Sequence, residues 1–416
     1  MIKVEKLKCG VTLVSEQLPA FNSAAFGVWV KTGAVNESKE IAGISHFIEH
    51  MMFKGTTTKS AKEIAESVDR IGGQFNAFTG KEATCYYIRT LSESLDTSME
   101  IVLDMLKNSL FDSREMSREK NVIYEEMKMV KDSPDDDAMD TIGEIIFKDS
   151  PLGNSVIGTK STLQRINRDK LVGYLKEQYT KDSIVVSVAG SFDLDRVKER
   201  VEEALGGFKE SKEAVKYPEN PAGEIFKVKT KDIEQSHLCL ATRTIDINDD
   251  RHYSLSVLNN IIGGSMSSRL FQNVREQKGL AYAVYSGNSS YSRDGFFNIY
   301  AGVSHDKISD AIGAIKEELA NIYENGVTED ELKKAKTQLK SSYIYGLENV
   351  NARMFLNGKS VLIKGRIDSQ EDVLHSIDAV KPEDIEDVKS LICDIDSYSG
   401  VLVTNKRKDL RKMVRS

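Results

Sequence analysis

The spacing of apolar and polar residues along the chain predicts blocks of strands and blocks of helices. In the first half, alternating or short β-branched apolar runs predict strands at 2–6, 11–15, 25–32, 74–79, 83–90 and 184–189. Apolar residues that recur every three or four positions predict helices at 43–53, 60–71, 161–178 and 193–206, and a longer helical group at 92–148. Because few strand–helix–strand units occur, we expect an α+β domain with helices on one face of a mostly antiparallel sheet.

The second half repeats this order of elements. Strands are predicted at 236–244, 281–290 and 295–303, and helices at 252–262, 268–276 and 305–364. The repetition predicts an internal duplication into two similar domains. Between the halves the chain is rich in Gly, Lys, Glu, Ser and Pro and has no periodic apolar face. We therefore predict a first domain at 1–210, a linker at 211–223 and a second domain at 224–416.

Composition narrows the class of protein. A chain of 416 residues is too long for one hydrophobic core, and 40% apolar with 29% charged residues is ordinary for a globular protein. Its 57 Lys and Arg against 64 Asp and Glu leave a formal charge of −7, which makes nucleic acid a poor partner. No apolar run is long enough to cross a membrane, no secretory signal pattern opens the chain, and the four cysteines are scattered. A cytoplasmic protein is expected.

Candidate chemistry is concentrated in the predicted helix 43–53. His46 and His50 lie at positions i and i+4, so their imidazoles project from one face about one turn apart and can bind one zinc ion. Glu49 flanks that face without taking a coordination position. A zinc ion lowers the pKa of a bound water to about 7, and Glu49 could accept the proton while the water attacks a polarised carbonyl. This pattern of residues predicts an enzyme that hydrolyses amide bonds.

Two hydrogen-bonded or exposed helix histidines would show the same spacing, so a third ligand has to decide between the interpretations. A catalytic zinc takes three protein ligands and keeps a fourth position open. The predicted helix that contains residues 119–127 offers Glu125 and Glu126. These side chains point about 100° apart, so only one of them can face the metal.

The run from His46 to Thr56, followed 76 residues after His50 by Glu126, resembles the pitrilysin/insulinase family of inverted-motif zinc peptidases. It is most similar to the processing-peptidase branch, which includes mitochondrial processing peptidase and bacterial relatives. The resemblance implies one Zn²⁺ per chain, Glu126 as the third ligand and Glu119 as a carboxylate behind it that orients a ligand or the zinc-bound water. Glu119 lies seven residues before Glu126, on the same helix face.

Two further segments resemble the family. The segment 72–79 is similar to the edge strand that pairs with an extended substrate, which implies that Asn76, Ala77, Phe78 and Thr79 bind peptide, although a core strand would show the same alternation. The segment 267–282 resembles the Arg/Tyr motif of the family. It implies that Arg275 and Tyr282 hold the substrate backbone and stabilise the tetrahedral oxyanion.

No second metal site is expected in the second half. Residues 267–271, which match the histidine motif by element order, contain no metal ligand. The remaining histidines are isolated in the sequence: His237, His252, His305 and His375.

The resemblance also implies a zinc endopeptidase that acts on peptides or unfolded segments inside a chamber formed by two chains. Two alternatives are a non-catalytic core-type subunit and a catalytic subunit that needs a different, inactive partner chain. The presence of His46, Glu49, His50 and Glu126 argues against the first. Because Arg275 and Tyr282 occur in the same chain, we expect a homodimer with composite active sites rather than the second.

Overall fold

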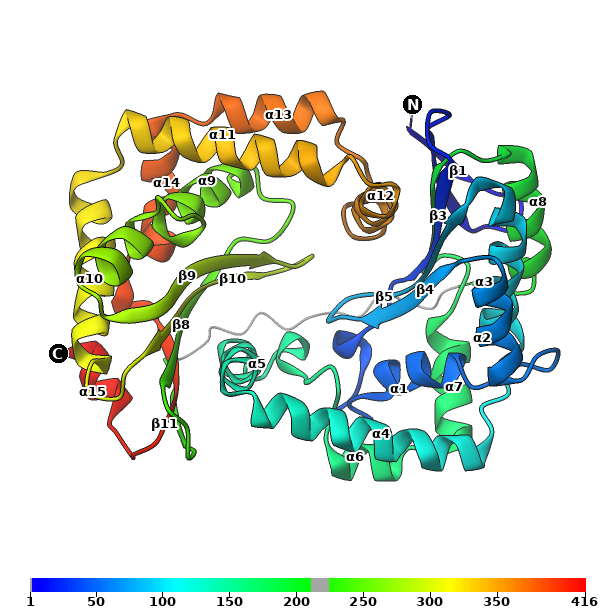
Figure 1. Ribbon diagram of the computed structural model, residues 1–416, viewed down its shortest axis with the longest axis horizontal. Coiled ribbons are helices and arrows are strands. Elements are labelled where there is room, and N and C mark those ends of the chain that lie inside the picture. Colours follow the sequence, from blue (N-terminus) through cyan, green and yellow to red (C-terminus); the bar gives the residue numbers. More distant parts are fainter. Residues whose placement is uncertain (1, 211–223) are drawn as a thin grey trace. The chain divides into compact units, whose positions relative to one another are not determined.

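The computed structural model describes residues 2–210 and 224–416, which divide into two compact units (Figure 1). Of these residues, unit 1 comprises 2–127, 154–210 and 344–367. Unit 2 comprises 128–153, 224–343 and 368–416. The predicted linker 211–223 lies outside the described residues. No described helix is long and apolar enough to cross a membrane.

Unit 1 is built on a six-stranded sheet with the strand order β1-β2-β6-β3-β5-β4. Its strands are β1 (Ile2–Lys6), β2 (Thr12–Gln17), β3 (Ser23–Val30), β4 (Gln74–Thr79), β5 (Thr84–Leu91) and β6 (Ile184–Gly190). Only the β2–β6 pair is parallel, so the sheet is mostly antiparallel as predicted. At one edge, β4 pairs with β5 alone among the described strands.

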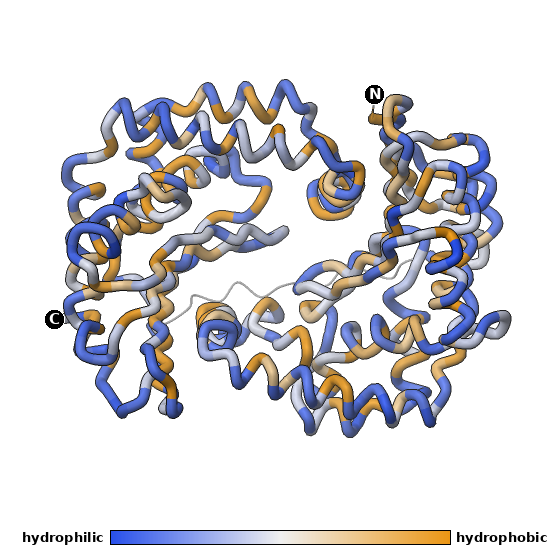
Figure 2. The backbone as a smooth tube through the Cα atoms, in the orientation of Figure 1, coloured by the Kyte–Doolittle hydropathy of each residue, from blue (hydrophilic) through white to orange (hydrophobic). Residues whose placement is uncertain are grey.

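Most helices of unit 1 cover one face of this sheet. They are α1 (Ile44–Met52), α2 (Ala61–Arg70), α3 (Leu95–Asn108), most of α4 (Ser113–Asp132), α6 (Lys160–Arg165), α7 (Arg168–Gln178) and α8 (Leu194–Leu205). Alternate residues of β3 explain the layer: Phe26, Val28 and Val30 have no exposed surface and join the core formed with these helices. Figure 2 shows hydrophobic and hydrophilic residues alternating along the helices, as expected when one face of each helix is buried.

The opposite face of the unit 1 sheet is covered by α12 (Val350–Lys364), which comes from the second half of the sequence. Met354 of α12 packs with Ala25 and Ala189 in a separate buried cluster. The Ser187 hydroxyl donates to the Met354 carbonyl at 2.9 Å, and the Asn357 amide donates to the buried carboxylate of Glu16 at 2.8 Å. Helix α12 is therefore an integral part of unit 1.

Unit 2 contains a five-stranded sheet with the order β7-β11-β8-β10-β9. Its strands are β7 (Phe226–Thr230), β8 (Ser236–Thr244), β9 (Ala281–Ser290), β10 (Gly295–Val303) and β11 (Ser399–Thr404). The helices are α5 (Pro134–Ile146), α9 (His252–Gly263), the π-helix η4 (Leu270–Gln277), α10 (Ile308–Asn325), most of α11 (Glu329–Gly346), α13 (Gln370–Ala379), α14 (Pro382–Ile392) and α15 (Leu410–Arg415).

Each unit contains one helix that comes from the other half of the sequence. Helix α5, from the first half, belongs to unit 2, where the Lys229 ammonium donates to Asp137 at 2.7 Å and Met139 contacts Cys239 of β8. The α+β class and the two similar sheets are as predicted. The compact units nevertheless differ from the sequence ranges 1–210 and 224–416 at α5 and α12, because helical periodicity does not specify which sheet a helix covers.

Candidate metal centre and peptidase site

Helix α1 holds three of the predicted site residues. It begins after Gly43, whose φ of +92° places it in the left-handed region. A Cβ at Gly43 would lie 2.7 Å from the Ile157 carbonyl oxygen, so both the backbone angle and the close approach require glycine. Phe47 and Met51 are completely buried in the core and fix the rotation of the helix about its axis. His46 and His50 are thereby held on the neighbouring face.

A buried carboxylate caps this helix. Glu37 Oε2 accepts a hydrogen bond from the Gly43 backbone N–H at 2.7 Å, and Oε1 accepts one from the Ser45 N–H at 2.8 Å. These N–H groups belong to the first turn, which has no partners within the helix. Burial raises the pKa of Glu37 to about 7, while the two backbone hydrogen bonds and Lys81 oppose the rise. Burial raises the pKa of the nearby Tyr174 hydroxyl, and the Glu37 carboxylate adds to that rise.

We expect this carboxyl to make the stability of the protein depend on pH. Its pKa in the folded state lies above the ordinary value of 4.5, so the folded chain holds a proton that the unfolded chain releases. The contribution of Glu37 to stability is therefore fully present below pH 4.5 and is lost as pH rises through about 7, by a total on the order of 3 kcal/mol. With EDTA present, Glu37→Gln should gain stability relative to wild type between pH 5.5 and pH 8 in thermal unfolding.

The exposed Glu66, whose carboxylate lies 3.5 Å from the Lys62 ammonium on α2, provides the control for this experiment. Glu66→Gln should follow the wild type at both pH values. A constant difference between Glu37→Gln and wild type across this range would contradict the assignment.

The structure brings His46, His50 and Glu126 together, within unit 1. One ligand atom from each residue can be chosen such that all lie within 4.8 Å of one another, and this is the one group of the kind found among the described residues. His46 Nε2 lies 3.6 Å from Glu126 Oε1, and His50 Nε2 lies 3.6 Å from Glu126 Oε2. Two imidazoles and one carboxylate form a donor set suited to a catalytic zinc ion.

The electrostatics of the two histidines fit metal binding. Burial, and then the neighbouring His50, lower the pKa of His46 to about 4, so this imidazole is neutral at physiological pH, as a metal ligand must be. His50 Nδ1 is hydrogen-bonded to Glu119 Oε2 at 3.1 Å, which leaves Nε2 directed at the cluster. His46 Nδ1 is buried and has no hydrogen-bond partner among the described residues. Within the described part of the chain, a carboxylate therefore orients His50 through Nδ1, and no side chain does the same for His46.

Glu49 projects from α1 beside this cluster. The Thr79 hydroxyl of β4 donates to Glu49 Oε2 at 2.5 Å, which fixes the carboxylate. Burial raises the pKa of Glu49, and the Thr79 hydrogen bond and His50 oppose the rise. A carboxylate whose pKa is raised is a better proton acceptor than an exposed one.

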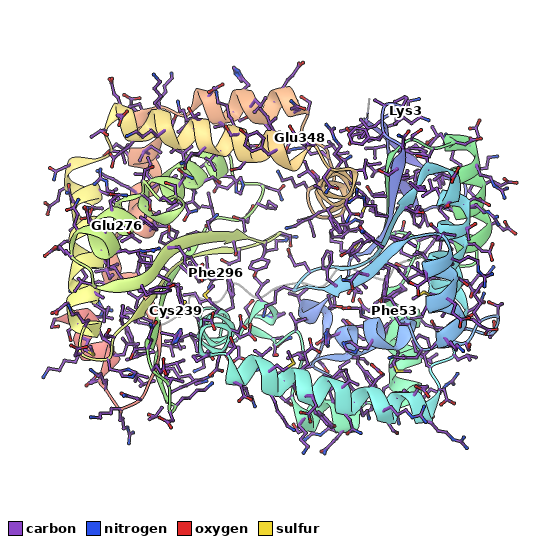
Figure 3. All side chains as sticks on the ribbon, in the orientation of Figure 1. Lys3, Phe53, Cys239, Glu276, Phe296 and Glu348 are labelled. Atoms are coloured by element: carbon purple, nitrogen blue, oxygen red, sulfur yellow. The ribbon has the colours of Figure 1, made fainter. Side chains whose placement is uncertain are left out.

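The predicted substrate segment is strand β4, at the edge of the unit 1 sheet. Asn76 and Phe78 are exposed, whereas Ala77 and Thr79 are half-buried on the other face. Phe53, directly after α1, packs against Phe75 of β4 with ring centroids 4.9 Å apart (Figure 3 labels Phe53). The edge strand is therefore attached to the helix that carries the histidines.

Arg275 and Tyr282 lie together in unit 2. Arg275 belongs to the π-helix η4, and its guanidinium lies 5.8 Å from the centre of the Tyr282 ring and 4.7 Å from that of Phe271. Tyr282, at the start of β9, is 76% exposed. π-Helices are rare in proteins, and those that occur are often found at functional sites. The sequence predicted an ordinary helix here, because apolar periodicity does not resolve the hydrogen-bond pattern.

Two histidines of the second half have structural partners. His237 Nδ1 is bonded to the Tyr300 hydroxyl at 2.7 Å, and His305 Nδ1 to the Ser236 hydroxyl at 2.7 Å. Neither belongs to a metal-binding group among residues 2–210 and 224–416.

Sequence reasoning assigned no role to two residues near the site. Glu37 lies in a predicted loop and gave no local signal. Lys54 lies four residues after His50, the same spacing that separates His50 from His46. This spacing was a signal that could have been used, and the Lys54 ammonium lies 2.6 Å from Glu119.

Two histidines on one helix and a carboxylate on another, packed against a mostly antiparallel sheet, are typical of a metallopeptidase site. Family models match most of the chain: the insulinase (peptidase family M16) model matches residues 12–160, and the peptidase M16 inactive domain model matches residues 165–339. Over 384 residues, the chain is 44% identical to the uncharacterized zinc protease YmxG of Bacillus subtilis, covering 92% of this chain and 93% of that protein. The chain belongs to the insulinase family of M16 peptidases.

Other proteins are similar over nearly the whole chain. An uncharacterized zinc protease of Rickettsia felis is 37% identical over 98% of both chains. Among solved structures, a protease from Helicobacter pylori has a TM-score of 0.90 at 23% identity, covering 97% of this chain and 99% of that one. A structure from Pseudomonas fluorescens described as a peptidase M16 inactive domain has a TM-score of 0.91 at 18% identity, covering 98% and 99%. These two structures support the fold.

Proposed function

We propose that this protein is a zinc-dependent endopeptidase that hydrolyses peptides or unfolded polypeptide segments. The observation that carries the proposal is the convergence of His46, His50 and Glu126, with Glu49 beside them held by Thr79. A zinc ion held by the three ligands would act as a Lewis acid and make water a nucleophile near neutral pH. The names of the relatives, which include zinc protease, support the same function.

The side chains of the site have separate roles in this proposal. Glu49 accepts a proton from the attacking water and later delivers it to the leaving amine. The Thr79 hydroxyl occupies Oε2 of Glu49, which directs Oε1 to the proton transfer. An extended peptide adds to the edge of β4 through main-chain hydrogen bonds, with residues Asn76 to Thr79 alongside the scissile bond.

Zinc content and activity provide the direct test. We expect about one zinc per chain and a peptidase activity that is lost with a chelator and restored by Zn²⁺. Digestion of a peptide library, read by mass spectrometry, would give the cleavage preference. A protein that binds zinc and cleaves no unfolded substrate would favour the alternative, a non-catalytic core-type subunit.

We further propose that the active site is shared between two chains of a homodimer, with Arg275 and Tyr282 of one chain stabilising the oxyanion at the zinc of the other. The presence of both motifs in one chain supports this arrangement, since no distinct partner is required. The exposure of Tyr282 leaves its hydroxyl accessible to a substrate.

Mixing two inactive variants tests the shared site. Glu49→Gln and Arg275→Ala chains should each be nearly inactive alone. After subunit exchange, about half of the dimers are mixed and have one complete site of two, so activity should recover to roughly a quarter of wild type. Native mass spectrometry must first show the mixed dimers. If these form and activity does not recover, the Arg/Tyr pair acts within its own chain or has no role.

A further inference from the structure

Glu119 has two oxygens with different partners. Oε2 is hydrogen-bonded to His50 Nδ1 at 3.1 Å, and Oε1 lies 2.6 Å from the ammonium of Lys54. The Glu119 side chain is only 7% exposed, and that of Lys54 is 30% exposed. A short charge-assisted hydrogen bond to a buried carboxylate fixes the plane of its oxygens. The contact thus differs from an ordinary surface ion pair, which contributes little.

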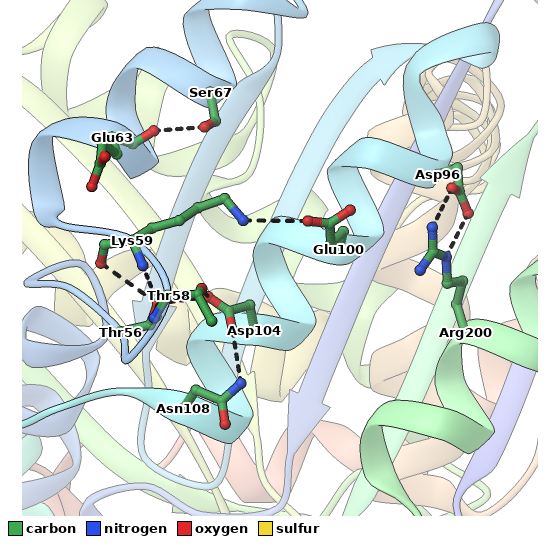
Figure 4. A network of polar contacts seen from close by, with 10 residues as sticks. All are labelled: Thr56, Thr58, Lys59, Glu63, Ser67, Asp96, Glu100, Asp104, Asn108 and Arg200. Carbon is green, nitrogen blue, oxygen red and sulfur yellow. Dashed lines mark hydrogen bonds and ion pairs between the residues drawn. The ribbon is translucent and has the colours of Figure 1, made fainter.

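The backbone around Lys54 is fixed by the neighbouring helix α3. Lys54 lies between the end of α1 and the loop 55–60, and the Leu110 N–H donates to the Gly55 carbonyl at 3.1 Å. Asp104 of α3 accepts hydrogen bonds from the hydroxyls of Thr56 at 2.6 Å and Thr58 at 2.8 Å, and Asn108 donates to its other oxygen at 2.7 Å (Figure 4). The loop that carries Lys54 is therefore anchored independently of the metal ligands.

We infer that Lys54 is a positioning residue of the metal centre, which acts on His50 through Glu119. With Lys54 bound to Oε1, Glu119 presents Oε2 to His50 Nδ1, and the imidazole keeps Nε2 toward His46 and Glu126. Without the ammonium, the buried carboxylate loses its charge partner and can rotate away from the imidazole. Partners of this kind behind a metal ligand change metal affinity by about 10- to 100-fold.

The inference rests on the proposed function, because it requires that the three-ligand site binds zinc. Its test therefore measures zinc affinity rather than peptidase activity. Apo-protein would be titrated with Zn²⁺ against a competing chelator of known affinity. We expect Lys54→Met to raise the Kd for zinc by roughly 10-fold or more, and Lys54→Arg, which keeps a cationic donor, to remain closer to wild type.

A double-mutant cycle separates an action through Glu119 from a general effect on the loop. Once Glu119→Gln has been introduced, Lys54→Met should weaken zinc binding little further, because the oriented charge is already absent. Lys59 in the same loop is the matched control, since its ammonium pairs with Glu100 at 3.3 Å, away from the metal ligands (Figure 4). Lys59→Met should bind zinc as wild type does.

The outcomes are distinguishable. Unchanged zinc affinity in Lys54→Met overturns the inference and leaves the proposed function intact. A full additional loss in the Glu119→Gln background also overturns it, because Lys54 would then act by another route. Wild-type protein that takes up no zinc would overturn the proposed function and this inference together. Thermal unfolding of each apo-variant identifies any substitution that prevents folding. If Lys54→Met does not fold, the zinc affinity of Lys54→Arg and the double-mutant cycle decide whether Lys54 acts through Glu119.

Discussion

Glu49→Gln should retain its zinc and lose peptidase activity by roughly 10² to 10⁴, the usual contribution of a positioned general base. Glutamine has the shape of glutamate and keeps an oxygen that can accept the Thr79 hydroxyl, so the local geometry should persist. It cannot accept a proton from the attacking water. Because Glu49 takes no coordination position, the donor set of His46, His50 and Glu126 is unchanged.

Zinc content by mass spectrometry and kcat/KM on an unfolded peptide substrate measure the two properties separately. Thr79→Val is a useful companion, since it removes only the hydroxyl that holds Glu49 and should lower activity less than Glu49→Gln does. Activity of Glu49→Gln near the wild-type level would exclude Glu49 as the base. Loss of zinc in the same variant would make Glu49 a ligand instead.

Glu126→Gln should reduce zinc affinity and activity together, whereas Glu125→Gln should do little. The Glu126 oxygens lie 3.6 Å from Nε2 of both histidines, and a neutral amide is a much weaker zinc ligand than a carboxylate. Glu125, one residue earlier on α4, is exposed. Glu125 and Glu126 have the same side chain and lie on the same helix, so Glu125→Gln is a matched control for Glu126→Gln.

Zinc titration against a competing chelator, followed by assays at saturating zinc, measures this difference. We expect Glu125→Gln to stay within a few tenths of a kcal/mol of wild type in stability, as exposed substitutions usually do. The opposite result, with zinc lost in Glu125→Gln and kept in Glu126→Gln, would move the ligand by one residue and require a different rotation of α4.

Local structure was largely predictable because it depends on residues close in sequence. The i, i+4 spacing places His46 and His50 on one face of α1 whatever the rest of the chain does. Gly43 supplies the left-handed residue at which that helix begins. Alternation along β3, β4 and β5 predicted strands for the same reason. Strands β7 and β11 were missed, because each is a short run whose pairing partners lie far away in the sequence: β11 pairs with β7 and with β8.

Contacts between residues from distant parts of the chain were decided only by tertiary packing. The residues on α4 could not by themselves distinguish Glu125 from Glu126, because that choice depends on how the helix is rotated against α1. The resemblance to the family implied a place for Glu119 behind a ligand, whereas its contacts with His50 and Lys54 depend on how α4 packs against α1. The same holds for α5 and α12, whose helical patterns are ordinary but which each cover the sheet of the other half. Sequence periodicity fixes which face of an element is buried, whereas the surface that buries it is set by the packing of the whole chain.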